Sequence, residues 1–217
     1  MIKRQRGRTI KNLPFNCKSS MEEKNWRNIF LRYFFIGLCL ILELIVTNQL
    51  NIIIYRFTDI CPLACENFLK LCTGEVGVLA NTETKLCYLN CPIHRIVPGG
   101  WLQCGDIVDG SGSNSVAAIG DANNKIRDEN LSVDFSEKLG GVVGFSKSAV
   151  HSNGSQFFIT LGPCPWMNNK FVGIGRVVRG FKTLRQISME DTKNQKPVKN
   201  IFISSCGKES NFLQDFE

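Results

Sequence analysis

Ile93-His-Arg-Ile-Val-Pro-Gly-Gly-Trp-Leu-Gln-Cys-Gly-Asp106 is the stretch of this 217-residue chain that says most about its fold. It contains two short apolar runs, Ile93–Val97 and Trp101–Cys104, which we take as candidate β-strands. A second informative stretch, His151-Ser-Asn-Gly-Ser-Gln-Phe-Phe-Ile159, leads into a third candidate strand, Gln156–Leu161.

The sequence around these stretches predicts many short strands and only two helices. Three further apolar runs are candidate strands: Val142–Phe145, Phe171–Val177 and Ile201–Ser205. Pro62 can open a helix that runs through Cys72 and is capped by Gly74. A second helix fits Phe181–Ser188. Short strands at this spacing favour a β-barrel or a β-sandwich.

An apolar run near the N-terminus, Tyr33–Leu42, allows two interpretations. Extended to Val46 it has 14 residues and is interrupted by Glu43, whereas a membrane-spanning helix needs roughly 20 apolar residues. It could be the apolar part of a targeting signal behind a basic segment. The alternative, which we favour, is a buried strand that forms a hairpin with a second strand, Asn51–Phe57.

The positive charge of the chain is concentrated in its first 32 residues. That segment has nine Lys or Arg against Glu22 and Glu23, and its net charge of +7 equals that of the whole chain. The remaining residues therefore sum to about zero. Any electrostatic partner should be sought at the N-terminus, but such tails are usually solvated linkers, so no nucleic acid partner is expected.

Conventional catalytic and metal-binding patterns are missing from the sequence. Cys61 and Cys65 are four residues apart, as are Cys87 and Cys91. This spacing suggests a zinc-binding site. No histidine lies at ligand spacing beside either pair, so small buried thiols are the preferred interpretation. The two histidines of the chain suggest no nucleophilic triad. We therefore expect no metal and no cofactor, and chemistry that needs neither a nucleophile nor proton transfer.

The two informative stretches resemble the hallmarks of the cyclophilin family. The first is similar to Phe-His-Arg-Ile-Ile-Pro-Gly-Phe-Met-x-Gln-Gly-Gly-Asp, and the second to Thr-Asn-Gly-Ser-Gln-Phe-Phe-Ile. Supporting matches occur in the family order at Cys61–Phe68, Cys72–Glu75, Asp128–Asn130 and Cys206-Gly207. The resemblance runs from about Leu40 to Gly207.

This resemblance implies a mainly β fold, a closed eight-stranded antiparallel barrel capped by two α-helices, with a basic N-terminal extension. Leu40–Val46 and Asn51–Phe57 would be its first two strands. The implied organisation is an extension over residues 1–35, the cyclophilin-like domain over 36–208 and a tail over 209–217. A monomer is expected.

The resemblance also implies a function, catalysis of rotation about X–Pro peptide bonds that assists protein folding. By position, Arg95 matches the catalytic arginine, Gln103 the glutamine that supports it, and Phe158 the aromatic floor of the proline pocket. The implied substrate-binding positions are Gly100, Trp101, Ser146, Lys147, Gln156, Trp166, Met167 and Phe171. Partners would be proline-containing segments of client proteins, and a cyclosporin-type ligand could contact Trp166.

Several positions depart from the family pattern. Gly100 and Trp101 stand where the family has Phe and Met, so the indole either refills the pocket or obstructs it. Phe171 replaces a pocket histidine, and Phe145-Ser-Lys147 replaces Met-Ala-Asn and adds a charge. Cys104 takes the place of a glycine, which would perturb the strand if that glycine had a positive φ.

Three features resemble the divergent peptidyl-prolyl isomerase-like 6 subgroup, whose members are often regarded as weak or inactive: Trp101, His151-Ser-Asn-Gly-Ser155 and Asn194-Gln-Lys-Pro197. Two functions therefore stay open, an isomerase of reduced activity and a proline-peptide binding module with little turnover. Asn153-Gly-Ser155 is a glycosylation sequon inside the second hallmark, where a glycan would clash with the groove. We therefore expect an intracellular, cytoplasmic protein without membrane association, with an N-terminal signal as the alternative.

Overall fold

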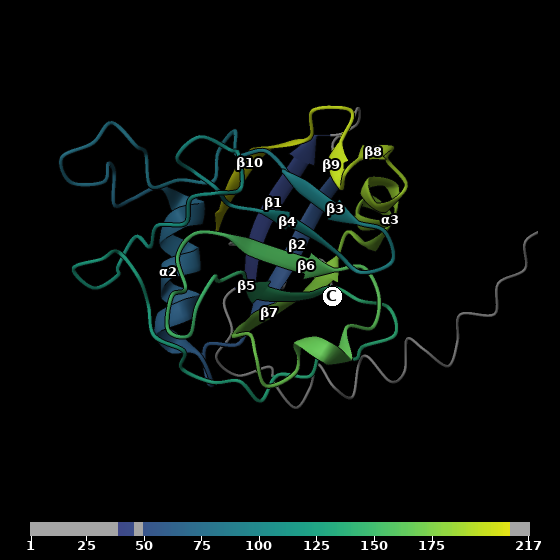
Figure 1. Cartoon of the computed structure of the whole chain (residues 1–217), viewed down its shortest axis with the longest axis horizontal. Helices are drawn as coiled ribbons and strands as arrows, with labels where there is room; N and C mark the ends of the chain where they lie inside the picture. Colours follow the sequence, from purple (N-terminus) through teal and green to yellow (C-terminus); the bar gives the residue numbers. More distant parts are fainter. Residues whose placement is uncertain (1–38, 46–49, 209–217) are drawn as a thin grey trace, which may run out of the picture. The chain divides into compact units, whose positions relative to one another are not determined.

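The chain forms a mainly β structure in which neighbouring strands are antiparallel (Figure 1). The computed structural model describes residues 39–45 and 50–208. The strands are β1 (Cys39–Ile45), β2 (Leu50–Arg56), β3 (Arg95–Val97), β4 (Trp101–Cys104), β5 (Val142–Phe145), β6 (Phe157–Thr160), β7 (Gly173–Arg179), β8 (Thr192–Lys193), β9 (Lys196–Pro197) and β10 (Phe202–Lys208). The main sheet has the order β10-β1-β2-β7-β5-β6-β4-β3, and β8 pairs with β9.

The chain just before β3 is hydrogen-bonded to the start of β10. The N–H of Ile93 donates to the carbonyl oxygen of Ile201 at 2.8 Å, and the N–H of Asn90 donates to that of Ile203 at 2.6 Å. In return, the N–H of Ile203 donates to the carbonyl of Cys91 at 3.0 Å. These bonds link the two ends of the strand order.

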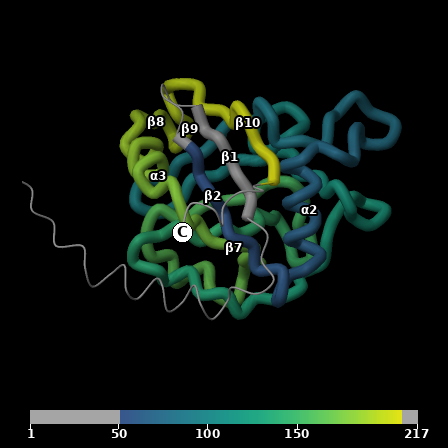
Figure 2. Tube along the Cα trace, turned by 180° about the vertical axis from the view of Figure 1, so that it is seen from behind, coloured from purple at the N-terminus to yellow at the C-terminus, as the bar shows by residue number. Residues whose placement is uncertain are grey.

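Two α-helices, α2 (Pro62–Thr73) and α3 (Phe181–Ser188), flank the strands in the described part of the chain. Figure 2 shows β2, β7 and β10 between them. The left-handed conformation of Gly74 (φ 68°) ends α2, with its N–H donating to the carbonyl of Lys70. The carboxylate of Glu129 accepts hydrogen bonds from the N–H groups of Leu63 and Ala64. It thereby satisfies two free donors at the positive end of the helix dipole.

An aromatic cluster fills the core beneath α2. The ring of Phe68 lies 5.4 Å from that of Tyr88 and 5.2 Å from that of Phe157, between ring centroids. The Tyr88 hydroxyl donates to the carbonyl of Ser155 at 2.6 Å, so its polar end is satisfied although the side chain is fully buried. Because side chains alternate along a strand, the next residue of β6, Phe158, packs in a separate cluster.

The prediction of a mainly β fold with two α-helices is confirmed, and Phe181–Ser188, Trp101–Cys104 and Val142–Phe145 have the predicted bounds. Other boundaries were wrong by a few residues. β3 begins at Arg95 because Ile93 pairs with Ile201 and not with β4.

Further boundary errors lie at β1 and β2, which were each predicted one residue too late in the sequence, and at β6, β7 and β10. β6 lacks Gln156 and Leu161, β10 begins at Phe202 and runs on to Lys208, and β7 begins two residues after Phe171. The hairpin of β8 and β9 was not predicted.

The N-terminal strand hairpin is confirmed by β1 and β2, which pair from Cys39 with Tyr55 to Leu44 with Leu50. The first part of the apolar run, residues 33–38, lies outside the described residues. Among the described helices, none has both the length and the apolar character needed to cross a membrane.

The first pair of cysteines, Cys61 and Cys65, are buried thiols at the beginning of α2, whereas in the second pair Cys91 is buried and Cys87 is only partly buried. Desolvation raises the pKa of Cys61 and of Cys65 to about 12. The Cys65 thiol donates to the carbonyl of Ile174 at 3.2 Å. Within residues 39–45 and 50–208, no three His, Cys, Asp or Glu side chains are grouped so as to hold a metal ion.

Candidate active site

The antiparallel register of β3 and β4 brings the first candidate residues together. Arg95 lies opposite Gln103, and Val97 lies opposite Trp101. The central guanidinium carbon of Arg95 is 5.3 Å from the centroid of the Trp101 ring, which is the geometry of a cation–π contact. The charge is therefore held beside an aromatic face at the edge of the sheet.

Three predicted site residues form one hydrogen-bond network. The side-chain amide nitrogen of Gln103 donates to Oε1 of Gln156 at 2.7 Å and to the hydroxyl of Ser146 at 3.1 Å. The amide nitrogen of Gln156 donates to the carbonyls of Gly112 and Asn114 at 2.8 and 2.9 Å. Because both amides have fixed partners, the network holds the wall of the site in one arrangement.

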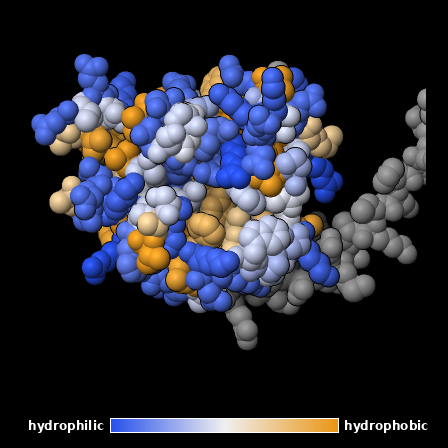
Figure 3. Space-filling view, in the orientation of Figure 1, coloured by the Kyte–Doolittle hydropathy of each residue, from blue (hydrophilic) through white to orange (hydrophobic). Residues whose placement is uncertain are grey.

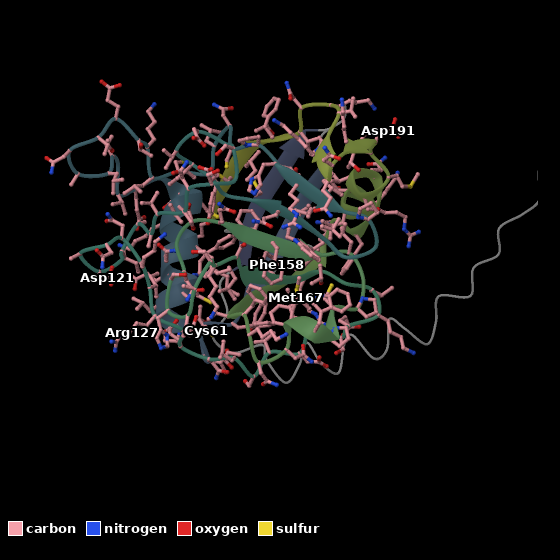
Figure 4. All side chains as sticks on the ribbon, viewed as in Figure 1. Cys61, Asp121, Arg127, Phe158, Met167 and Asp191 are labelled. Carbon is pink, nitrogen blue, oxygen red and sulfur yellow. The ribbon has the colours of Figure 1, made fainter. Side chains whose placement is uncertain are left out.

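Phe158 lies in an apolar cluster on the other face of β6 from Phe157. Its ring centroid is 5.6 Å from that of Phe135 and 5.4 Å from that of Phe171. The cluster consists of Phe135, Val142, Phe158, Cys164 and Met167, with Trp101, Val133 and Phe171 packed against it. Figure 3 shows an apolar hollow near the middle of the molecular surface that faces the viewer. Figure 4, drawn in the same orientation, labels Phe158 and Met167 next to each other in this region.

Two of the predicted substrate-binding residues differ strongly in burial. Gly100 is buried, and a Cβ added there would lie 3.2 Å from Cγ1 of Val97. Trp166 belongs to a short 3₁₀ helix, Pro165–Met167, and its side chain is 53% exposed. An added side chain at residue 100 would therefore have to displace a neighbour, whereas Trp166 is accessible to a ligand.

Lys147 is engaged in an ion pair. Its ammonium nitrogen lies 2.6 Å from Oδ2 of Asp128, and the two side chains are 9% and 5% exposed. Burial opposes ionisation of Asp128, but hydrogen bonds from Lys147, from the Asn153 amide and from the N–H of His151 prevail and lower its pKa. The charge that Lys147 adds to this segment is thus neutralised by a carboxylate of the neighbouring loop.

Cys104 does not disturb β4. It pairs with Phe157 in the ladder between β4 and β6, and its thiol donates to the carbonyl of Cys91 at 3.8 Å. The positive φ belongs to the next residue, Gly105 (φ 94°), where a Cβ would lie 2.4 Å from the carbonyl oxygen of Ser155. Glycine is therefore required at 105 and not at 104.

One residue of the site was not predicted. The Nε–H of Arg95 donates to Oε1 of Gln195 at 2.7 Å, and Gln195 lies in the turn between β8 and β9. The polar sequence of this hairpin gave no strand pattern, and a separation of 100 residues cannot be bridged by spacing arguments. Gln195 thus joins Arg95, Gln103 and Trp101 as part of the site's geometry.

Comparison with known proteins shows the family to which the chain belongs. The family model described as cyclophilin type peptidyl-prolyl cis-trans isomerase/CLD matches residues 42–208. The human protein named "Probable inactive peptidyl-prolyl cis-trans isomerase-like 6" is 39% identical over 157 residues, 72% of this chain and 49% of that protein. The cattle protein of the same name is 37% identical over 158 residues, 73% of this chain and 50% of that protein.

A more distant relative, the mouse "NK-tumor recognition protein", is 34% identical over 158 residues, 72% of this chain and 10% of that protein. The chain thus spans about half the length of the isomerase-like 6 relatives it matches. The family model covers more than half of the sequence, so the chain belongs to the cyclophilin-type peptidyl-prolyl cis-trans isomerase family.

Proposed function

We propose that this chain catalyses cis–trans isomerisation of X–Pro peptide bonds, with Arg95 as the catalytic residue. The observation that carries the proposal is the position of its guanidinium beside Trp101, which itself packs against the apolar cluster around Phe158. A permanent cation next to an apolar hollow suits a ligand that combines a proline ring with a polar amide.

Catalysis of this isomerisation requires few groups besides the cation and the apolar hollow. Rotation about the peptide bond has a barrier of about 18–20 kcal/mol, because amide resonance is lost in the twisted state. No covalent bond changes, so the site needs only to stabilise the twisted amide more than the planar one. Within residues 50–208, neither terminal nitrogen of Arg95 has an acceptor, so both can donate to the substrate.

The other site residues would bind and orient the peptide. We propose that Phe158, Met167 and Phe171 contact the proline ring, and that Gln103 and Gln156 support the polar wall. The remaining proposed contacts are Gly100, Trp101, Ser146, Lys147 and Trp166. A cyclosporin-type ligand would occupy the same groove, with Trp166 at its rim.

We also propose that the sheet closes into a barrel and that the chain divides at about residues 35 and 208. The hydrogen bonds between Asn90–Ile93 and Ile201–Ile203 support the closure, because they join the two ends of the strand order. The limits of the family match, residues 42–208, support the division.

A second function is a proline-peptide binding module with little turnover. Gly100 and Phe171 favour it, because both depart from the family's proline pocket, and the human and cattle relatives carry names that call them probably inactive. The departures leave Arg95 in place, so we prefer the enzyme.

A protease-free fluorescence assay on an Ala-Pro-Phe peptide tests the choice. An enzyme accelerates relaxation of the cis population in proportion to protein concentration. A binding module gives no acceleration, although calorimetric titration of the same peptide shows saturable binding. Neither acceleration nor binding would contradict both functions.

A further inference from the structure

The turn between β8 and β9 is attached to β3 beside Arg95 at two points. The N–H of Ile96 donates to the carbonyl oxygen of Gln195 at 2.7 Å. The Nε–H of Arg95 donates to the side-chain oxygen of the same glutamine, also at 2.7 Å. Main chain and side chain of Gln195 therefore bind consecutive residues of β3, so the amide oxygen is aimed at the guanidinium by the fold.

The backbone of this turn is unusual for a glutamine. Asn194 and Gln195 have φ of 52° and 66°, and a two-residue hairpin turn with positive φ at both positions strongly favours Asn-Gly. The other described non-glycine residues with positive φ are asparagines and His151, which are types that tolerate this region better. A strained conformation of this kind suggests that the side chain is kept for a function.

Gln195 is also the residue that restrains Arg95 where Gln103 would be expected to do so. The side-chain nitrogen of Gln103 is directed to Gln156 and Ser146. Among residues 50–208, Gln195 provides the one side-chain acceptor for the Arg95 guanidinium. With Nε bound to Gln195 and the planar group against Trp101, the two terminal nitrogens are held in a fixed direction.

We propose that Gln195 is a positioning residue, which orients the Arg95 guanidinium for its action on a bound proline peptide; this inference rests on the proposed function. The hydrogen bond to Nε fixes rotation of the guanidinium plane and leaves the terminal N–H groups for the substrate. Losing it allows Arg95 to sample orientations that do not meet the twisted amide.

The test is Gln195→Gly, with Asn194→Gly as the matched control. Both substitutions remove a non-glycine residue from a positive-φ position of the same turn, so both should keep or raise the unfolding midpoint. Only Gln195→Gly removes the acceptor of Arg95. We expect it to lower kcat/KM about fivefold, the ratio that one hydrogen bond contributes, mainly through kcat. Asn194→Gly should match the wild type.

Two further measurements separate positioning from a structural role. The Nε–H signal of Arg95 in NMR spectra should exchange faster with water in Gln195→Gly than in Asn194→Gly. In an Arg95→Ala background, Gln195→Gly should have no further effect on kcat/KM, because a residue that acts only through Arg95 has nothing left to position. Additive losses would overturn the proposal.

The outcomes also distinguish this proposal from the proposed function. If the wild type accelerates isomerisation and Gln195→Gly is equally fast, the positioning role is refuted and the enzyme stands. If the wild type does not accelerate it, the proposed function fails and affinity for the Ala-Pro-Phe peptide decides. Weaker binding by Gln195→Gly alone then supports positioning of Arg95, and equal binding by all variants overturns it.

Discussion

Replacing Trp101 with methionine, the residue that the family has at this position, is expected to weaken binding of proline peptides. Trp101 contributes the aromatic face beside Arg95 and an apolar surface against the Phe158 cluster. A cation–π contact at a partly exposed site is worth ~0.5–1 kcal/mol. An aromatic anchor in a binding site contributes ~1–3 kcal/mol, part of which a flexible methionine retains.

Together these contributions predict a net loss of ~1 kcal/mol, or a roughly fivefold higher Kd. Isothermal titration with an Ala-Pro peptide measures it, and Trp101→Phe serves as the matched variant. Because phenylalanine keeps a ring face, its Kd should lie between those of the wild type and Trp101→Met. Thermal melts check that the variants remain folded. Tighter binding and faster turnover by Trp101→Met would refute the reasoning and show that the indole obstructs the groove.

The further predictions concern the loops that support the site. Asp128→Asn leaves the buried ammonium of Lys147 without its partner and should cost ~3 kcal/mol of stability; a melt identical to the wild type would contradict the ion pair's role. The pKa of Asp128 is lowered from 3.8, so the stability that its carboxylate contributes to the folded protein should be complete above pH 3.8 and disappear as the pH falls through the folded-state pKa. Urea melts of wild type and Asp128→Asn should therefore converge at lower pH. Gly105→Ala should be destabilising by at least ~2 kcal/mol in a urea melt, because of the positive φ and the clash with Ser155, and a loss below about 0.5 kcal/mol would refute it. Glu129→Gln should lower stability by ~1 kcal/mol through weaker capping of α2, and no change in the unfolding midpoint would show that the charge is not needed.

Much of the fold could be predicted because its signals are local. Pro62 and Gly74 mark the beginning and the C-terminal cap of α2 within the sequence itself, and the short apolar run Val142–Phe145 forms a strand buried at every residue. The beginnings of β3 and β10 were missed because they depend on the pairing of Ile93 with Ile201, which are more than 100 residues apart. Such tertiary contacts override local patterns.

In the candidate site, too, the sequence predicts the residues of the motifs but not their tertiary contacts. The sequence motifs identified Arg95 and Gln103 as candidates. They could not show that Gln103 donates a hydrogen bond to Gln156, or that the acceptor for Arg95 lies in a distant hairpin. Likewise, the sequence shows the charge of Lys147 but not the carboxylate that neutralises it. Hydrogen-bond partners of long polar side chains depend on the packing of whole elements, which residue spacing does not encode.

The proposed isomerase activity depends above all on Arg95, and the most direct test compares isomerisation by the wild type, Arg95→Ala and Arg95→Lys in the protease-free assay. We expect Arg95→Ala to lower kcat/KM at least about tenfold, or ~1.4 kcal/mol of barrier. Arg95→Lys should recover little, because a point charge does not reproduce the planar set of donors. Equal rates for the wild type and Arg95→Ala would contradict the catalytic role of Arg95 and leave a peptide-binding module.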